Sequence, residues 1–254
     1  MTPRWHSTTT PGVRPRRTAP FLESPAGHKP GILNHNAAPT MPAPMDPQLA
    51  DLIVRHLTTP IEPIRLVVDP GSPTLAQGAA ALALVRAIAA AVPNVILDAR
   101  DPSPASDDPP GPTIVIDGPV ARGRLRYRGV PQALEMEGFF AALGLVANPT
   151  EPDPATLGPL RGVQQDVELL VFVTPSCWQC PQVVRAAQRL ALASPFVTTT
   201  VVDATGHPDL VRRHHVLGVP KVVSSSGMEH LGPVSEDELA RAVAASVDTP
   251  PRPG

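Results

Sequence analysis

The same order of secondary-structure signals occurs twice along this 254-residue chain. Each copy contains a helical pattern, an apolar strand, a long helix and a second strand, then a proline, two short strands and a final helix. The strands are expected at 64–68, 94–99, 111–117 and 124–129 in the first copy, and at 167–173, 196–204, 218–225 and 228–232 in the second. This alternation predicts an α/β fold in which each copy forms a mixed sheet flanked by helices.

Apolar residues with a helical period mark the helices of both copies. They are expected at 47–57, 74–92 and 132–146, and at 153–163, 178–193, 207–216 and 235–246. In the first copy the proline-rich loop 100–111 replaces one helix. We therefore predict two tandem lobes, at 45–147 and 153–247. The alternative is a chance likeness between two mixed α/β segments, which the shared proline–strand–strand–helix ending argues against.

The composition restricts the class of protein. Proline accounts for 35 of 254 residues and aromatics for 3%, so the cores must be small and built mainly from Ala, Val and Leu. The net charge of −2 argues against nucleic-acid and membrane partners. Residues 1–44 and 248–254 are expected to be disordered tails. Because the first of these lacks the apolar segment of a signal peptide, we expect a cytoplasmic protein.

Both cysteines of the chain lie in VFVTPSCWQCPQVV, residues 171–184, between an apolar strand and a helix. Cys177 is expected at the helix N-terminus, where unpaired N–H groups lower a thiol pKa. Cys177 is therefore the expected nucleophile, and Cys180, one turn further on, the resolving thiol. Trp178 and Gln179 carry no charge that would stabilise the thiolate further, which favours a reducing couple.

Three other interpretations of the cysteine pair stay open. A metal site needs at least three ligands, and its further ligands would come from the histidines of the second lobe, none of which has a tight spacing to the cysteines: His207, His214, His215 and His230. The cysteines can also be inert buried thiols. A cysteine hydrolase would need a histidine and a third, orienting group.

Val219 and Pro220 open a strand after a turn in the second lobe. An X–Pro bond in such a turn is either cis, a form found in about 5–6% of cases, or the trans start of an edge strand. A cis bond would leave the backbone of Val219 available to an extended substrate segment beside Cys177. We expect Trp178, Val219 and Pro220 to bind substrate.

Three segments carry a resemblance to the thioredoxin/glutaredoxin fold: SCWQCPQVVRAAQRLA (176–191), GVPKVV (218–223) and YRGVPQALEMEGFFAAL (127–143). The doubled arrangement over residues 46–246 resembles the tandem thioredoxin-fold protein disulfide oxidoreductases and the N-terminal domain of the F subunit of alkyl hydroperoxide reductase. The resemblance implies two thioredoxin-like lobes, of which the second carries the chemistry. In the first lobe, DPGSPTL (69–75) stands where a cysteine pair would be.

The resemblance also draws attention to Glu135. In that family the last helix of the first lobe begins with Gly-His-Glu, and the glutamate lies near the redox pair of the other lobe. Here the positions read Ala133, Leu134 and Glu135. A buried carboxylate there could take the proton of the resolving thiol, whereas an ordinary solvated glutamate could not. Val171 stands where thioredoxins carry a buried aspartate, which favours the glutaredoxin-like or disulfide-oxidoreductase branch.

The sequence thus predicts a thiol–disulfide oxidoreductase without a bound cofactor, in which Cys177, Cys180 and Glu135 are the catalytic residues. The resemblance implies a flavoprotein or a dithiol protein as reductant, and a protein disulfide as client, with a peroxiredoxin as one candidate. The alternatives are a non-catalytic interaction module that keeps the fold, or a metal-binding protein that uses the cysteines with histidine.

Overall fold

The computed structural model describes residues 46–247, apart from 58–59, 61, 73–75 and 102–110. Both predicted tails and most of the loop 100–111 therefore lie outside the described residues. The described residues all belong to one compact unit. None of the helices described in this unit is both long and apolar enough to cross a membrane.

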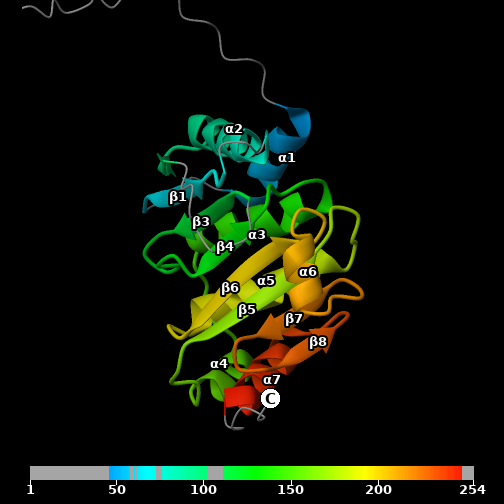
Figure 1. Cartoon of the computed structure of the whole chain (residues 1–254). Coiled ribbons are helices and arrows are strands. Elements are labelled where there is room, and N and C mark those ends of the chain that lie inside the picture. The colour runs from blue at the N-terminus through cyan, green and yellow to red at the C-terminus, as the bar shows by residue number, and fades with distance from the viewer. Residues whose placement is uncertain (1–45, 58–59, 61, 73–75, 102–110, 248–254) are drawn as a thin grey trace, which may run out of the picture. The chain divides into compact units, whose positions relative to one another are not determined.

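The helices and strands follow the predicted order (Figure 1). The first half contains α1 (Pro47–His56), β1 (Ile64–Asp69), α2 (Ala76–Ala91), β2 (Val95–Ala99), β3 (Thr113–Asp117), β4 (Leu125–Arg128) and α3 (Leu134–Ala147). The second half contains α4 (Pro154–Leu160), β5 (Val167–Val173), α5 (Cys180–Ala193), β6 (Val197–Asp203), α6 (Pro208–Arg213), β7 (Lys221–Ser224), β8 (Glu229–Leu231) and α7 (Glu236–Val247). The predicted α/β fold is confirmed.

The strands of the two halves pair in the same way. In the first half, β1 pairs parallel with β2 and antiparallel with β3, and β3 pairs antiparallel with β4. In the second half, β5, β6, β7 and β8 repeat these pairings in the same order. The repeat that the sequence predicts is therefore a repeat of sheet topology. The residue limits of the two lobes, which we call the first and second lobe below, remain predictions.

The two half-sheets join into one eight-stranded sheet, with the order β2-β1-β3-β4-β6-β5-β7-β8. The join is a parallel pairing of β4 with β6, in which Leu125 lies opposite Thr199 and Arg128 opposite Val202. The sequence did not predict this join. Its consequence is that the C-terminal end of β4 and the α3 helix that follows lie beside the second lobe.

Helices cover the two faces of the sheet unequally. The main core contains buried side chains from six helices, α1 to α5 and α7, together with alternate residues of the strands. The opposite face has a small second core where Leu210 of α6 packs against Phe172, Val202 and Val223. The corresponding part of the first lobe is the loop 100–111, so no helix in its described residues covers that face.

Local sequence signals start several helices. Asp46 caps α1 by accepting hydrogen bonds from the N–H groups of Gln48 and Leu49, and Pro47 occupies the first turn. Ser235 and Glu238 form a capping box at α7, because each side chain accepts from the backbone N–H of the other. These caps explain why the predicted and observed starts of the two helices agree closely.

Candidate redox site

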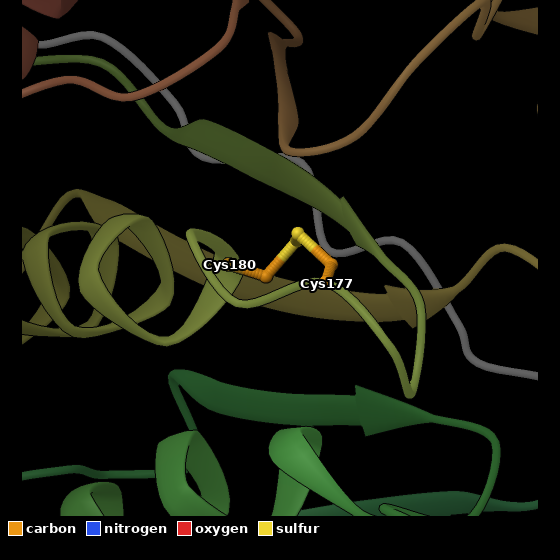
Figure 2. Close-up of a disulfide and its surroundings, with 2 residues drawn as sticks. All are labelled: Cys177 and Cys180. Atoms are coloured by element: carbon orange, nitrogen blue, oxygen red, sulfur yellow. A yellow bond between two sulfur atoms is a disulfide. The ribbon is translucent and has the colours of Figure 1, made fainter.

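A disulfide joins Cys177 to Cys180 at the start of α5, with their Cα atoms 5.4 Å apart (Figure 2). The strand β5 leads into this site through the loop formed by residues 174–176. The side chains of β5 are buried on the main-core face at Val167, Leu169 and Val171. A largely buried strand therefore holds one end of the loop, and a helix packed on the same core holds the other.

The helix begins at Cys180, two residues later than the sequence predicts. Residues 177–180 form a turn in which the N–H of Cys180 donates to the carbonyl of Cys177 at 3.3 Å. Pro181 explains this difference, because it has no N–H to donate to Cys177 in the α-helical pattern. Cys177 thus precedes the first helical residue and belongs to the turn rather than to the helix.

The two cysteines differ in solvent exposure. Cys180 is 2% exposed and belongs to the main core, whereas Cys177 is only partly buried. An incoming thiolate or client disulfide can therefore reach the sulfur of Cys177 much more easily than that of Cys180. This asymmetry supports the assignment of Cys177 as the attacking residue and Cys180 as the resolving one.

The three predicted substrate-binding residues differ in exposure. Trp178 is 78% exposed, Pro220 is buried, and Val219 is partly buried against the main core. The Val219–Pro220 bond is cis. Phe172 of β5 lies opposite Lys221 of β7, and this register continued by two residues brings Val219 beside the start of the cysteine loop.

Val219 also has backbone groups that can accept a partner. In the part of the chain that the structure describes, neither its N–H nor its carbonyl is engaged in a backbone hydrogen bond. The carbonyl of the next residue, Pro220, accepts from the N–H of Gly232. The turn is therefore anchored immediately after Val219, while Val219 itself keeps its donor and acceptor available.

The first lobe reaches the cysteine loop through the N-terminus of α3. The N–H of Leu134 donates to the carbonyl of Pro175 at 3.2 Å, which links the two lobes two residues before Cys177. Ala133, the residue before the helix, has a φ of 43° and a ψ of −120°, a conformation that favours glycine. Alanine therefore stands where the resembled family has glycine, although the backbone conformation suits glycine better.

We expect Ala133→Gly to stabilise the protein by about 1 kcal/mol. The strain of an alanine in this region costs about 1–3 kcal/mol, and the greater freedom of an unfolded glycine offsets part of that gain. Thermal unfolding should show a rise in Tm of about 2–4 °C. Ala83→Gly, the same substitution in the exposed middle of α2, is the control and should destabilise by about 1 kcal/mol. A lower Tm for Ala133→Gly would contradict the strained conformation.

Glu135 is buried in the first turn of α3, with 6% of its surface exposed. One carboxylate oxygen accepts a hydrogen bond from the N–H of Gln132 at 3.1 Å. The other, Oε1, is buried and has no hydrogen-bond partner among the described residues. Glu135 and Cys180 line the same small cavity. The interpretation of Glu135 as a solvated helix residue is therefore wrong.

The environment of Glu135 favours its protonated form. Burial raises the pKa of the Glu135 carboxyl to about 7, and the negative charge of Asp203 contributes in the same direction. The hydrogen bond from Gln132 acts against this shift because it stabilises the charged form. Glu135 therefore titrates near neutral pH, which is the range in which a group can both accept and release a proton efficiently.

Asp203, at the end of β6, is the second buried carboxylate at this site and is 5% exposed. Its Oδ1 accepts hydrogen bonds from the N–H and the hydroxyl of Thr205. Asp203 has no distinguishing signal in the sequence, because an aspartate after a strand is usually part of a turn. Tyr127 of β4, which lines the cavity with Glu135 and Cys180, was likewise not predicted.

The histidines of the second lobe do not assemble around the cysteines. His207 is buried and its Nδ1 lies 3.0 Å from the carbonyl of Asp203, whereas His214 packs against the ring of Phe172. Within the described residues, no group of three or more His, Cys, Asp or Glu side chains is arranged to hold a metal ion. The metal-binding interpretation thus has no ligand set in this part of the chain.

Comparison with curated proteins finds relatives that are named as redox enzymes. The chain is 24% identical over 139 residues to the F subunit of alkyl hydroperoxide reductase of Pseudomonas aeruginosa, which covers 54% of this chain and 26% of the relative. The corresponding protein of Escherichia coli is 26% identical over 112 residues, or 44% of this chain and 22% of the relative. The chain thus spans about a quarter of the length of these relatives. No protein-family model matches it.

Solved structures show the same fold over most of the chain. The NTD_N/C domain of the F subunit of alkyl hydroperoxide reductase of Enterococcus faecalis superposes with a TM-score of 0.64 at 17% identity, covering 77% of this chain and 95% of that one. A protein disulfide oxidoreductase of Aeropyrum pernix gives 0.65 at 18% identity, covering 79% and 91%. The predicted resemblance is confirmed: the chain has the tandem thioredoxin fold of the protein disulfide oxidoreductases and of the N-terminal domain of the F subunit of alkyl hydroperoxide reductase.

Proposed function

We propose that the chain exchanges electrons with protein disulfides through the Cys177/Cys180 pair. The observation that carries this proposal is the disulfide at the start of α5, with one accessible and one buried sulfur. The thioredoxin fold of the chain and the oxidoreductase names of its relatives agree with this chemistry. A thiol–disulfide exchange needs no bound cofactor, because the two cysteines themselves carry the two electrons.

In the first step the Cys177 thiolate of the reduced protein attacks one sulfur of the client disulfide. A mixed disulfide forms between Cys177 and the client, and the second client sulfur leaves as a thiolate. The partial exposure of Cys177 permits this attack. The N–H groups at the start of α5 stabilise the thiolate as they stabilise any anion near a helix N-terminus.

In the second step Cys180 attacks the sulfur of Cys177 and releases the other client sulfur as a thiolate. Cys180 must first lose its proton, because the thiolate is the attacking species, and its burial keeps bulk water from taking the proton directly. We assign the proton to the Glu135 carboxylate, which lines the same cavity. With a pKa of about 7, Glu135 is partly ionised at neutral pH and can accept it.

The client is proposed to bind as an extended segment beside Val219. The available backbone groups of Val219 can form strand-like hydrogen bonds with it. Trp178 and Leu217 are 78% and 94% exposed, respectively, and supply apolar contact area for client side chains. Pro220 is buried and fixes the turn that presents Val219.

The electrons need a separate source, because the disulfide must be reduced after each cycle. The resemblance to the F subunit of alkyl hydroperoxide reductase supports a flavoprotein or a dithiol protein as reductant and a peroxiredoxin as a client candidate. We propose the cytoplasm as the location, since such reductants keep dithiols reduced there.

Insulin reduction by dithiothreitol tests the proposal. We expect the wild-type protein to accelerate the reaction and Cys177→Ser to give no more than the rate of dithiothreitol alone. Thr199→Val, which removes a buried hydroxyl of β6 away from the cysteines, is the control for a general loss of stability and should keep the acceleration. Equal rates for wild-type protein and Cys177→Ser would instead favour a non-catalytic interaction module.

A further inference from the structure

Tyr127, the only tyrosine of the chain, lies at the boundary of the two lobes. It belongs to β4, the strand of the first lobe that pairs with β6 of the second. Its side chain is buried, and its ring packs edge-on against Phe139 of α3 with centroids 5.1 Å apart. A buried phenol needs a hydrogen-bond partner, so the surroundings of its hydroxyl matter.

The hydroxyl of Tyr127 has one donor among its neighbours and no acceptor. The Nε2 of Gln188, on α5, donates to the hydroxyl oxygen at 3.4 Å and to the carbonyl of Gly138 at 3.2 Å. The bond to Gly138 fixes the orientation of the Gln188 amide, because a carbonyl can accept only from the nitrogen of that amide. Burial raises the pKa of the Tyr127 phenol strongly, so the hydroxyl keeps its proton. Among the described residues, no group accepts a hydrogen bond from this proton.

The position of the hydroxyl is closely fixed by the helices around it. A Cβ on Gly138 would lie 3.2 Å from the Tyr127 oxygen and 2.9 Å from a methyl group of Val184 on α5. The absence of a side chain at Gly138 therefore lets α3 and α5 approach each other across the hydroxyl. The hydroxyl oxygen has little freedom to move elsewhere.

A small cavity of about 10 Å³ is lined by Tyr127 and by Gly138, the residue whose Cβ position lies 3.2 Å from the hydroxyl oxygen. Three of its lining residues are polar or redox-active: Tyr127, Glu135 and Cys180. The volume is close to the minimum that holds a single water molecule. Two of these residues have a hydrogen-bonding position without a protein partner, namely the hydroxyl proton of Tyr127 and Oε1 of Glu135.

We propose that Tyr127 is a positioning residue of the redox site, whose hydroxyl donates to one water in this cavity while that water donates to Oε1 of Glu135. Cys180 is the remaining polar or redox-active residue of the lining, so the same water lies in the cavity that the resolving cysteine borders. The water gives the hydroxyl proton of Tyr127 an acceptor and Oε1 of Glu135 a donor, and it fixes the Glu135 carboxyl against the resolving cysteine. The inference rests on the proposed role of Glu135, and it makes the first lobe a direct contributor to the site.

The hydrogen bond from Tyr127, passed on by the water, favours the ionised form of Glu135. Among the described residues, the titratable groups that face Glu135 are Asp203 at the end of β6, Tyr127 on β4 and the cysteine pair before α5. Asp203 disfavours ionisation, and the disulfide does not titrate. Tyr127 is therefore the one side chain of this set that stabilises the Glu135 carboxylate.

Because the chain has one tyrosine, labelling tyrosine with ¹³C at Cζ gives a single NMR signal from this site. We expect this signal of the oxidised wild-type protein to shift with pH, with a midpoint near 7, the pKa of Glu135. In Glu135→Gln the signal should not move between pH 5 and 9. A signal that is insensitive to pH in the wild-type protein, or that moves equally in both, would overturn the proposal.

Tyr127→Phe tests the same water-mediated link between Tyr127 and Glu135 through the pH dependence of mixed-disulfide resolution. Loss of the donor should move the pH midpoint for resolution of the mixed disulfide upward by about half to one pH unit. Thr199→Val, which removes another buried hydroxyl that does not line the cavity, should leave the midpoint unchanged. An unshifted midpoint in Tyr127→Phe would contradict the proposal.

The two measurements also separate this inference from the proposed function. If Glu135 does not take the proton of Cys180, resolution shows no midpoint near 7 in any variant, while the tyrosine signal still titrates. If Tyr127 is only a packing residue, Tyr127→Phe keeps the wild-type midpoint of resolution, although the tyrosine signal can still respond to the charge of Glu135 through space. A high-resolution crystal structure should show one water bonded to Tyr127 and Glu135.

Discussion

A Cys180→Ser variant is expected to accumulate a stable mixed disulfide between Cys177 and its client. The first attack needs only Cys177, which is accessible, whereas release of the client needs the second thiol. Turnover in insulin reduction should therefore fall to the rate of dithiothreitol alone, although the first step still occurs. Non-reducing electrophoresis and mass spectrometry of the reduced variant mixed with an oxidised client would detect the adduct.

The matched control is Cys177→Ser, which keeps only the buried thiol. Because Cys180 is 2% exposed, it should form little or no adduct with the same client. Adduct formation by Cys177→Ser at the rate of Cys180→Ser would mean that the two sulfurs are equally accessible in solution. That result would contradict the assignment of attacking and resolving roles.

Most helices and strands could be predicted from the sequence because each has a strong local signal. The apolar strands VELLVFV (167–173) and IRLVV (64–68) are buried on the main-core face, and α1 and α7 begin at their own capping residues. The join between β4 and β6 has no such signal. It is a pairing of backbone groups between strands that are distant in the chain, in which Leu125 lies opposite Thr199. Backbone hydrogen bonds between strands depend little on which side chains the strands carry, so the sequence could not predict the join.

The candidate site was only partly predictable for a related reason. The cysteine pair is a local motif, and its setting between a strand and a helix is visible in the sequence. The burial of Glu135 depends on how α3 packs against the second lobe, and a solvated helix could carry the same residues. Tyr127 reaches the site only because β4 pairs with β6. Both contributions of the first lobe therefore follow from the unpredicted join.

Glu135→Gln is expected to change the pH dependence of stability. The folded-state pKa of Glu135 is raised from 4.5 to about 7, so between these values the folded protein binds more protons at this site than the unfolded chain. The stability that this residue contributes is fully present below pH 4.5 and is lost as pH rises through 7. A shift of this size corresponds to about 3 kcal/mol, reduced to about 2 kcal/mol by solvent screening.

Urea unfolding of the oxidised protein at pH 5 and pH 8 measures this effect. The wild-type protein loses the contribution of Glu135 as the pH rises, whereas the variant has no such contribution to lose. The unfolding free energy of Glu135→Gln, relative to that of the wild-type protein, should therefore be about 2 kcal/mol higher at pH 8 than at pH 5. The control is Glu238→Gln on α7, where hydrogen bonds from Ser235 lower the pKa of the glutamate, so its ionisation does not change in this range. A difference between wild-type protein and Glu135→Gln that stays constant with pH would show that Glu135 titrates normally.

The same variant should also remove the pH midpoint near 7 from resolution of the mixed disulfide, because a glutamine cannot accept the proton of Cys180. The pH dependence of stability then reports the pKa of the Glu135 carboxyl, and the pH dependence of resolution reports whether this carboxyl takes the proton of Cys180. A raised pKa without an effect on resolution would make Glu135 a buried structural acid. A raised pKa together with slowed resolution would make it the proton acceptor, since only that role requires the carboxylate to exchange a proton with the cysteine during the reaction.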